Sequence, residues 1–290
     1  MKVGVLGCGA MGGAMALRLA ETGEAPACWD ASEAARARMA AAGLTVAASA
    51  EALAGASDLL ILSLPHAEAV RAAMAEASGA LRNGAAVLDT STSEPAVSQA
   101  LAAQGAAEGW VFLDGPVSGG PAGARGGTMT MLLGGDEAAA ARLAPVLDRL
   151  TGKRVHVGGS GAGHAAKIAN NMLCAANLAL VAEAVRLGEA AGVPAEKLLE
   201  GVNAGSGRSA VSEVNFPRWV LSGAYDSGFT MGLMRKDVRL AEALGAASGV
   251  AMPAFEGIAR VWADSAARLA DAADFNEIAR PGAAAEEPNA

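Results

Sequence analysis

The sequence of 290 residues has few cysteines, few aromatic residues and no excess of basic residues. Its three cysteines, Cys8, Cys28 and Cys174, lie far apart, which excludes a disulfide framework and a paired zinc-ligand pattern. We therefore expect a reduced, cytoplasmic protein without a bound metal. The formal net charge of −8 argues against nucleic acid or an anionic membrane surface as the main partner.

The sequence also lacks an uninterrupted apolar run of membrane-spanning length. Its first twenty residues, MKVGVLGCGAMGGAMALRLA, are apolar with one early lysine, as in a secretory signal. Glycines interrupt this segment, however, and Arg18 lies where the apolar part should continue. We interpret it as part of the folded protein and expect no membrane partner.

The residues that are present predict two different halves. Hydrophobic residues make up 52% and charged residues 18%, which is typical of a globular protein. The first half alternates β-type runs with helical ones, as in a parallel sheet flanked by helices. The expected strands lie at residues 2–6, 27–30, 58–64, 85–91, 110–117, 128–135 and 154–158, and the first two helices at 10–22 and 32–42.

The pattern changes after Gly163. No convincing strand follows, and helical spacing is found at residues 165–191, 195–203, 236–248 and 254–271. The segment GGSGAG places the domain boundary near Ser160. We therefore predict an α/β domain over residues 1–160 and an all-α domain over residues 161–290, with a frayed tail from about residue 281.

The segment GCGAMG directly follows the first expected strand and opens the first expected helix. In this context Gly7 allows a tight turn, Gly9 lets the backbone approach a pyrophosphate, and Gly12 lets the helix pack on the strand. Ala10 and Met11 complete the turn, and the N–H groups of the helix N-terminus face the phosphates. The pattern predicts a Rossmann-type, doubly wound sheet that binds a dinucleotide.

Asp30 ends the second expected strand, 18 residues after Gly12. Its carboxylate can accept both hydroxyls of the adenosine ribose and would repel a 2′-phosphate. Ala31 offers no counter-charge, and we expect Arg36 and Arg38, farther down the helix, to be solvated. NAD is therefore preferred over NADP. An alternative role for Asp30 as a helix cap is weaker, because Ser32 is better placed for it.

Two later loops follow the carboxyl ends of strands, where ligands lie in open α/β sheets. The first contains Leu64 and Pro65, and the second contains Thr92. We predict that the backbone of the first loop and the Thr92 hydroxyl line the cofactor.

With these motifs in place, the sequence resembles the β-hydroxyacid dehydrogenases, which include 3-hydroxyisobutyrate dehydrogenase and tartronate semialdehyde reductase. Four ordered blocks, between Met1 and about Arg280, carry the resemblance: GVLGCGAMGGAMALRLAETG, DGPVSGGPAGARGGTM, GGSGAGHAAKIANNML and GFTMGLMRKDVRLA. The resemblance implies hydride transfer between NAD and a short β-hydroxyacid, or reduction of the matching semialdehyde.

The resemblance assigns substrate binding to Ser118, Gly119 and Gly120 in the second block. The residue types agree with that role, because successive N–H groups in a glycine-rich turn form a concave site for an anion such as a carboxylate. A purely structural turn would explain the two glycines but not the serine.

In the third block the resemblance makes Lys167 the catalytic residue and Asn171 its substrate-binding neighbour. Positions 167 and 171 lie one helical turn apart on the same face. A lysine desolvated beside a bound alcohol can accept and return the hydroxyl proton. The alternative is a lysine that extends from the helix start into water.

Four further residues have roles that the sequence motifs do not fix. Lys236 maps to the second lysine of the family, which closes over cofactor and substrate; its alternative is a solvated lysine paired with Asp237. We expect Asn170 and His164 to have structural roles. Arg125 is either a contact for an anionic group or exposed.

Two other functions compete with this assignment. The related 6-phosphogluconate dehydrogenases use a histidine and a glutamate where this chain has Asn170 and Cys174, so decarboxylation is disfavoured. A non-catalytic NAD-binding interaction protein is disfavoured because Lys167, Asn171 and Ser118 are all present.

The identity of the small carboxylic acid is undecided from the sequence. Candidates are 3-hydroxyisobutyrate, glycerate, L-serine and threonate, with an NADP-preferring, glycerate-forming tartronate semialdehyde reductase as the main alternative. Because the second-half helices are too apolar for a small isolated domain, we also expect a homodimer or homotetramer formed through residues after Ala165.

Overall fold

The computed structural model describes residues 1–280, and the predicted frayed tail lies outside the described residues. The chain divides into two compact units, Met1–Lys167 and a second that begins at Ile168. This division falls inside one long helix, a few residues after the glycine-rich segment at Ser160.

The first unit is a nine-stranded sheet with the order β3-β2-β1-β4-β5-β6-β8-β7, with β9 paired to β8. Strands β1 to β6 are parallel to one another. β8 runs antiparallel to β6 and β7. The strands are β1 Val3–Leu6, β2 Ala27–Trp29, β3 Thr45–Val46, β4 Leu59–Leu62, β5 Ala86–Asp89, β6 Val111–Asp114, β7 Val117–Ser118, β8 Met129–Gly134 and β9 Thr151–Gly158.

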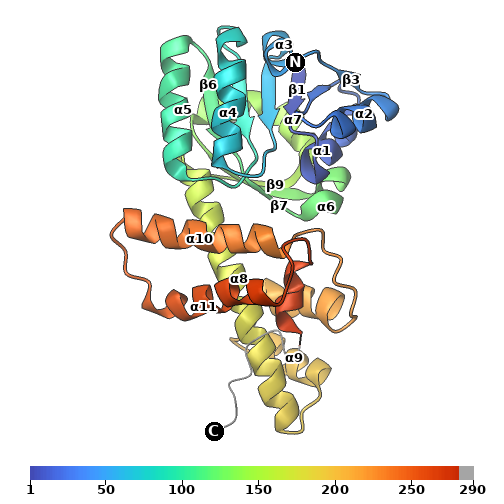
Figure 1. The fold of residues 1–290 in the computed structure, drawn as a ribbon, viewed down its shortest axis with the longest axis vertical. Helices are drawn as coiled ribbons and strands as arrows, with labels where there is room; N and C mark the ends of the chain where they lie inside the picture. The colour runs from blue at the N-terminus through green and yellow to red at the C-terminus, as the bar shows by residue number, and fades with distance from the viewer. Residues whose placement is uncertain (281–290) are drawn as a thin grey trace. The chain divides into compact units, whose positions relative to one another are not determined.

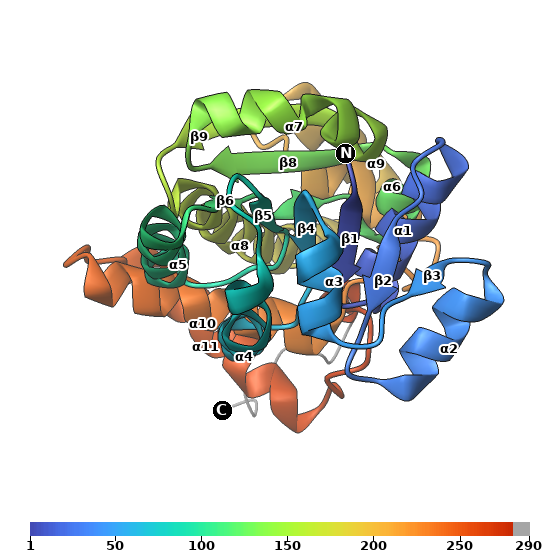
Figure 2. The same ribbon diagram turned by 90° about the horizontal axis from the view of Figure 1, so that it is seen from above.

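Helices cover both faces of this sheet (Figure 2). They are α1 Ala10–Glu21, α2 Glu33–Ala41, α3 Ala50–Ala56, α4 Ala67–Ala77, the short 3-10 helix Ser78–Ala80, α5 Pro95–Glu108, α6 Gly120–Gly126 and α7 Glu137–Leu150. On β4, Leu59 and Ile61 belong to the core that includes α1 and α7, whereas Leu60 and Leu62 belong to the core with α3, α4 and α5. Successive strand residues point to opposite faces, so a strand buried on both faces is apolar throughout.

The second unit is helical. It contains most of α8 Ala162–Ala190, then α9 Ala195–Ala204, a π-helix Val211–Val220, α10 Met231–Ala247, α11 Pro253–Asp264 and two 3-10 segments, Ser265–Ala267 and Phe275–Ala279. Among the described residues its only strand-like pairing is an isolated bridge between Thr230 and Asp274. The predicted fold class, a doubly wound sheet followed by an all-α domain, is confirmed (Figure 1).

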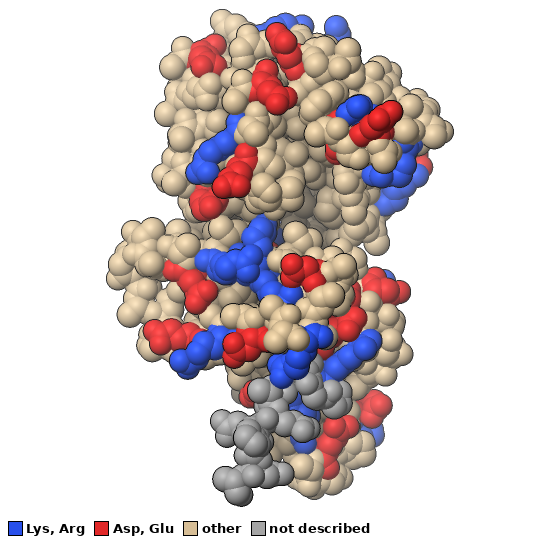
Figure 3. Space-filling model, viewed as in Figure 1, with Lys and Arg blue, Asp and Glu red and all other residues tan. Residues whose placement is uncertain are grey.

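Helix α8 supplies the centre of the second core. Its buried residues Ile168, Ala175, Leu178, Ala182 and Val185 form one helical face. By length and composition alone α8 could also cross a membrane, although the sequence analysis found no uninterrupted apolar run. Core helices of soluble proteins pass the same test. On the visible surface of each unit, basic side chains have acidic ones close by (Figure 3).

Three local differences from the sequence analysis have physical causes. Strand β3 is only two residues long, too short for a periodic pattern to detect. Residues 120–126 form helix α6, with Pro121 in its first turn, where a proline is tolerated because it lacks only an N–H that would be unpaired. The predicted helix 254–271 ends at Asp264 and continues as a 3-10 turn.

Candidate active site

In the turn between β1 and α1, each of the three motif glycines meets a different steric requirement. Gly7 has φ +92°, and a Cβ there would lie 2.3 Å from the Ser63 carbonyl oxygen. A Cβ at Gly12 would lie 1.8 Å from the Gly7 oxygen, so the helix could not approach the strand. Gly9, in contrast, has open space beside it. The turn therefore presents bare backbone on one side, as a pyrophosphate requires.

The N-terminus of α1 fits the same ligand. Among the described residues no side chain caps it, and its first turn holds no acidic residue, so its positive end is available to an anion. A cleft of about 360 Å³ lies beside this helix start. It is lined by Gly9, Ala10, Gly13, Ala14, Leu17, Arg38, Met39, Pro121 and Arg125.

Asp30 follows β2 and holds the turn in shape. Its Oδ2 accepts the Cys8 N–H at 2.6 Å, and its Oδ1 accepts the Ser32 N–H at 2.7 Å. Ser32 caps α2 by accepting the Ala35 N–H, as the sequence predicted. A carboxylate oxygen accepts more than one hydrogen bond, so Asp30 retains capacity for ribose hydroxyls.

The prediction that Arg36 and Arg38 are solvated agrees with Arg38, which is exposed, whereas Arg36 is half-buried. Both guanidinium groups also bind backbone carbonyls. Arg36 Nη1 donates to the carbonyl oxygens of Asp30 at 2.6 Å and Ala31 at 2.9 Å. Arg38 Nη2 donates to the Cys8 carbonyl at 2.9 Å. The guanidinium groups fold back because the carbonyls of the loops that follow β1 and β2 lie outside the sheet's hydrogen bonds and accept from a flexible donor.

The loops after β4 and β5 meet each other. The Leu64 N–H donates to Ser91 Oγ at 3.0 Å, and the Thr90 hydroxyl donates to the Leu62 carbonyl at 2.6 Å. These bonds hold the predicted cofactor loop, with Leu64 and Pro65, against the loop that carries half-buried Thr92. Their position at the carboxyl ends of neighbouring parallel strands is the usual ligand edge of such a sheet.

Ser118 lies on β7 and is joined to Lys167 of α8. Lys167 Nζ donates to Ser118 Oγ at 2.6 Å, and the lysine is only 6% exposed. A lysine that extended into water would keep its ammonium exposed, so this alternative does not describe Lys167. Gly119 and Gly120 follow Ser118 with φ +122° and +63°. Both glycines adopt backbone conformations that other residues rarely do.

Within the second unit, Asn171 and Lys236 share a partner that the sequence analysis did not select. The Asn171 Nδ2 donates to Asp237 Oδ2, and Lys236 Nζ lies 3.3 Å from Asp237 Oδ1. Asp237 is 1% exposed. The Asn170 amide donates to Asn171 Oδ1 at 3.0 Å. Asn171 is thus oriented from both sides of its amide.

Asp237 had one signal in the sequence, an acidic residue between the basic residues of RKDVRLA and directly after Lys236. That position predicts no more than a partner for a solvated Lys236. The structure pairs Asp237 with Lys236, but the Lys236 side chain is only 20% exposed and is therefore not a solvated lysine. Arg125 forms a bidentate ion pair with Glu21 across the α1–α6 contact.

Comparison with known proteins agrees with this architecture. Residues 2–159 match the family model described as the NAD-binding domain of 6-phosphogluconate dehydrogenase. Residues 161–281 match the model described as NAD-binding of NADP-dependent 3-hydroxyisobutyrate dehydrogenase.

Individual relatives cover nearly the whole chain. The 2-(hydroxymethyl)glutarate dehydrogenase of Eubacterium barkeri is 36% identical over 87% of this chain and 85% of its own. The NAD-dependent L-serine dehydrogenase of Pseudomonas aeruginosa is 34% identical over 87% and 88%. A solved structure of Mycobacterium tuberculosis 3-hydroxyisobutyrate dehydrogenase with L-serine superposes with a TM-score of 0.91, at 33% identity, over 96% of this chain and 97% of that one.

The fold, the glycine turn and the two family models define a protein that binds NAD(H). This chain belongs to the β-hydroxyacid dehydrogenase family, as the sequence motifs predicted. Its relatives indicate NAD-dependent hydroxyacid dehydrogenase activity.

Proposed function

We propose that this protein oxidises 3-hydroxyisobutyrate, or a short β-hydroxyacid of similar size, with NAD. The observation that carries the proposal is the contact between Lys167 Nζ and Ser118 Oγ at 2.6 Å, with the lysine 6% exposed. This contact supports the proposal, because a buried lysine beside a glycine-rich turn would be positioned to exchange a proton with an acid whose carboxylate binds that turn. Two of the relatives, a 2-(hydroxymethyl)glutarate dehydrogenase and an L-serine dehydrogenase, support the same substrate class.

Bound NAD supplies the acceptor for hydride. Gly7, Gly9, Ala10, Met11 and Gly12 would hold its pyrophosphate on the α1 N-terminus. Asp30 would accept the ribose hydroxyls, and the loops with Leu64, Pro65 and Thr92 would line the cofactor edge. The fit depends on the open space beside Gly9 and the uncapped first turn of α1.

The chain's own residues would handle the proton and the acid. The N–H groups around Ser118, Gly119 and Gly120 would bind the substrate carboxylate. Lys167 Nζ would accept the hydroxyl proton as the alcohol becomes a carbonyl, and would return it in the reverse direction. Asn171 and Lys236, both held by Asp237, would bind the substrate, and Lys236 also the cofactor.

A kinetic panel tests this proposal. The purified protein is mixed with 3-hydroxyisobutyrate, L-serine, glycerate, threonate and 2-(hydroxymethyl)glutarate, each with NAD and with NADP, and formation of reduced nicotinamide is followed. We expect the highest kcat/KM for 3-hydroxyisobutyrate with NAD.

Other outcomes would identify the alternatives. Faster reduction of tartronate semialdehyde with NADPH would favour a glycerate-forming reductase. Cofactor binding without turnover of any of these acids would favour a non-catalytic NAD-binding protein.

A further inference from the structure

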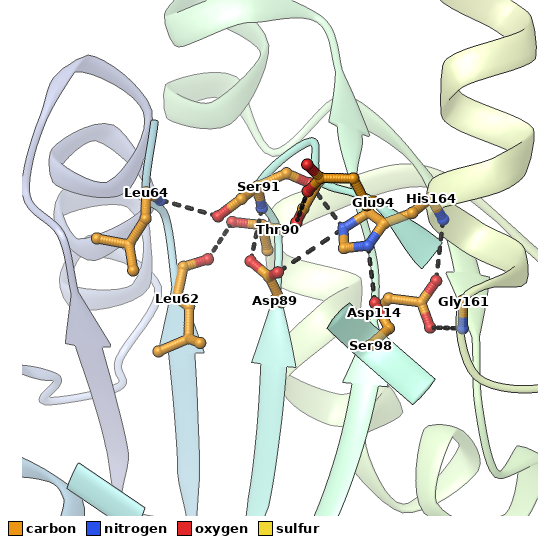
Figure 4. A network of polar contacts seen from close by, with 11 residues as sticks. Leu62, Leu64, Asp89, Thr90, Ser91, Glu94, Ser98, Asp114, Gly161 and His164 are labelled. Atoms are coloured by element: carbon orange, nitrogen blue, oxygen red, sulfur yellow. Dashed lines mark hydrogen bonds and ion pairs between the residues drawn. The ribbon is translucent and has the colours of Figure 1, made fainter. Parts of the chain in front are cut away.

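The first turn of α8 is attached to the ends of two neighbouring strands by buried side chains that the proposed mechanism does not use (Figure 4). Asp89 ends β5 and Asp114 ends β6, and the two are register partners in the parallel sheet. Both are fully buried. Buried carboxylates are costly unless they are hydrogen-bonded, so the partners of each one indicate what it does.

Asp114 holds the start of α8. Its Oδ1 accepts the Gly161 N–H at 2.7 Å, and its Oδ2 accepts the His164 N–H at 2.9 Å. The first N–H groups of a helix have no partner within the helix, and a carboxylate is stabilised at this positive end. Here the capping carboxylate comes from a strand about 50 residues earlier in the chain. It therefore joins the helix to the sheet.

Two glycines allow this close approach. A Cβ on Gly163 would lie 2.5 Å from the Leu132 carbonyl oxygen and 2.9 Å from Asp114 Oδ2. A Cβ on Gly134 would lie 2.6 Å from the Gly163 nitrogen and 2.8 Å from both carboxylate oxygens of Asp114. The glycines of the motif after Ser160 thus let the helix start contact the sheet.

His164 is a second anchor for the same turn. Its Nδ1 lies 2.8 Å from Ser98 Oγ on α5, and its Nε2 lies 3.0 Å from the Ser91 carbonyl oxygen. Because a carbonyl only accepts, Nε2 carries the hydrogen. Asp89 Oδ2, which lacks a hydrogen-bond partner among the described residues, lies 3.8 Å from this Nε2. Both ring nitrogens are engaged and the side chain is 0% exposed, which supports a structural role.

We propose that Asp114 is a positioning residue for Lys167. This inference rests on the proposed function, in which Lys167 transfers the proton. Lys167 lies three residues after His164, about 4.5 Å along the helix axis and on the same side. A shift of the helix start therefore moves Lys167 Nζ relative to Ser118 Oγ. Misplacement of a reacting group by about 1 Å can cost on the order of 10²-fold in rate.

The first test compares the effects on kcat of replacing two helix-capping carboxylates, Asp114 at α8 and Asp136 at α7. In Asp114→Asn the amide can accept only one of the two N–H groups, so we expect kcat to fall by about 10- to 100-fold. The dissociation constant of NAD should stay within about twofold, since Asp114 does not belong to the glycine turn. The control is Asp136→Asn, because Asp136 caps α7 of the same unit by accepting the Ala139 N–H at 2.7 Å. We expect this control to leave kcat unchanged.

The decisive measurement is a double-mutant cycle with Lys167→Ala, followed by single turnover with enzyme in excess. If Asp114 acts through Lys167, Asp114→Asn has no further effect once the lysine is absent. An equal loss in both backgrounds would overturn the proposal and indicate a general effect on the fold. When Lys167 is retained, Asp114→Asn should lower the maximal kcat of the pH profile and leave the pH of its midpoint unchanged. A shifted midpoint with unchanged height would show that Asp114 acts by charge, and would also overturn the proposal.

A second variant covers the case in which Asp114→Asn does not fold. Ser98→Ala removes the partner of His164 Nδ1 and should lower kcat by about 3- to 10-fold, as expected for one lost hydrogen bond, again only when Lys167 is present. An inactive Lys167→Ala together with fully active Asp114→Asn and Ser98→Ala would overturn this inference alone. A fully active Lys167→Ala would overturn the proposed function as well.

Discussion

Lys167 and Ser118 are 49 residues apart in the sequence, and their side chains meet at 2.6 Å. The lysine comes from the second turn of α8 and the serine from the end of β7. The contact unites two motifs that the sequence shows separately, a glycine-rich turn and a lysine in an apolar helix.

Replacement of Lys167 should abolish turnover and spare cofactor binding. Lys167→Arg keeps the positive charge but does not release a proton near neutral pH, so kcat should fall by about 10²–10⁴-fold, as for Lys167→Ala. Affinity for NAD, measured by fluorescence titration, should change little. The control is Lys197→Ala on α9, an exposed lysine paired with Glu200. Substantial activity in Lys167→Arg would reduce the lysine to an electrostatic anchor.

Replacement of Asp30 should shift the cofactor preference toward NADP. Asp30→Ala with Ala31→Arg removes two acceptors of ribose hydrogen bonds, which lowers NAD affinity by about 30- to 1,000-fold, the equivalent of about 2–4 kcal/mol. The Tm should also fall, because Asp30 accepts the Cys8 and Ser32 N–H groups. Glu33→Ala, a carboxylate in the first turn of α2, is the control. Wild-type protein that turns over NADP as well as NAD would contradict this assignment.

Asp89 should make the protein less stable as the pH rises. Burial raises the pKa of Asp89 above its ordinary value of 3.8, opposed by the charge of His164. The native state therefore keeps a proton that the unfolded state releases above about pH 4, and the stability contributed by this group is lost as the pH rises through the raised pKa. Asp89→Asn cannot ionise, so its Tm relative to wild type should increase with pH.

Asp58 provides a control of opposite sign for this pH experiment. The Lys2 N–H donates to Asp58 and lowers the pKa of its carboxyl group. Its stabilising effect is present above the ordinary pKa and is lost as the pH falls. Asp58→Asn should therefore lower the Tm at neutral pH and match wild type in acid. Parallel Tm curves for wild type and Asp89→Asn would show that Asp89 is ionised throughout.

The second unit should mediate a homodimer or homotetramer. Leu173, Leu180 and Leu187 recur every seven residues on α8 and are 57%, 52% and 73% exposed, so they form one apolar stripe that a second copy would cover. Leu180→Glu should reduce the mass measured by light scattering to that of a smaller species. Val250→Glu, at a residue that is 58% exposed elsewhere in the unit, is the control. A wild-type monomer at every concentration would contradict the prediction.

Local sequence determined the elements and most of the motifs. Continuous apolar runs predicted buried strands, and Gly7, Gly9 and Gly12 predicted the turn after β1, because only backbone sterics and period are needed to recognise them. Ser32 was recognisable as a helix cap for the same reason. The change from strands to helices after Gly163 likewise indicated two halves. Each of these features depends on residues within one or two turns of each other.

Tertiary structure decided which distant polar groups meet. Nothing near Asp114 in the sequence shows that it caps α8, and nothing near Asp237 shows that it accepts a hydrogen bond from Asn171. Arg36 and Arg38 fold back onto backbone carbonyls that only the assembled turn presents. Hydrogen bonds between residues tens of positions apart depend on the order of strands and the approach of helices, which no local period encodes. The sequence therefore supplied the chemical groups, and the sheet with its attached helix supplied their distances.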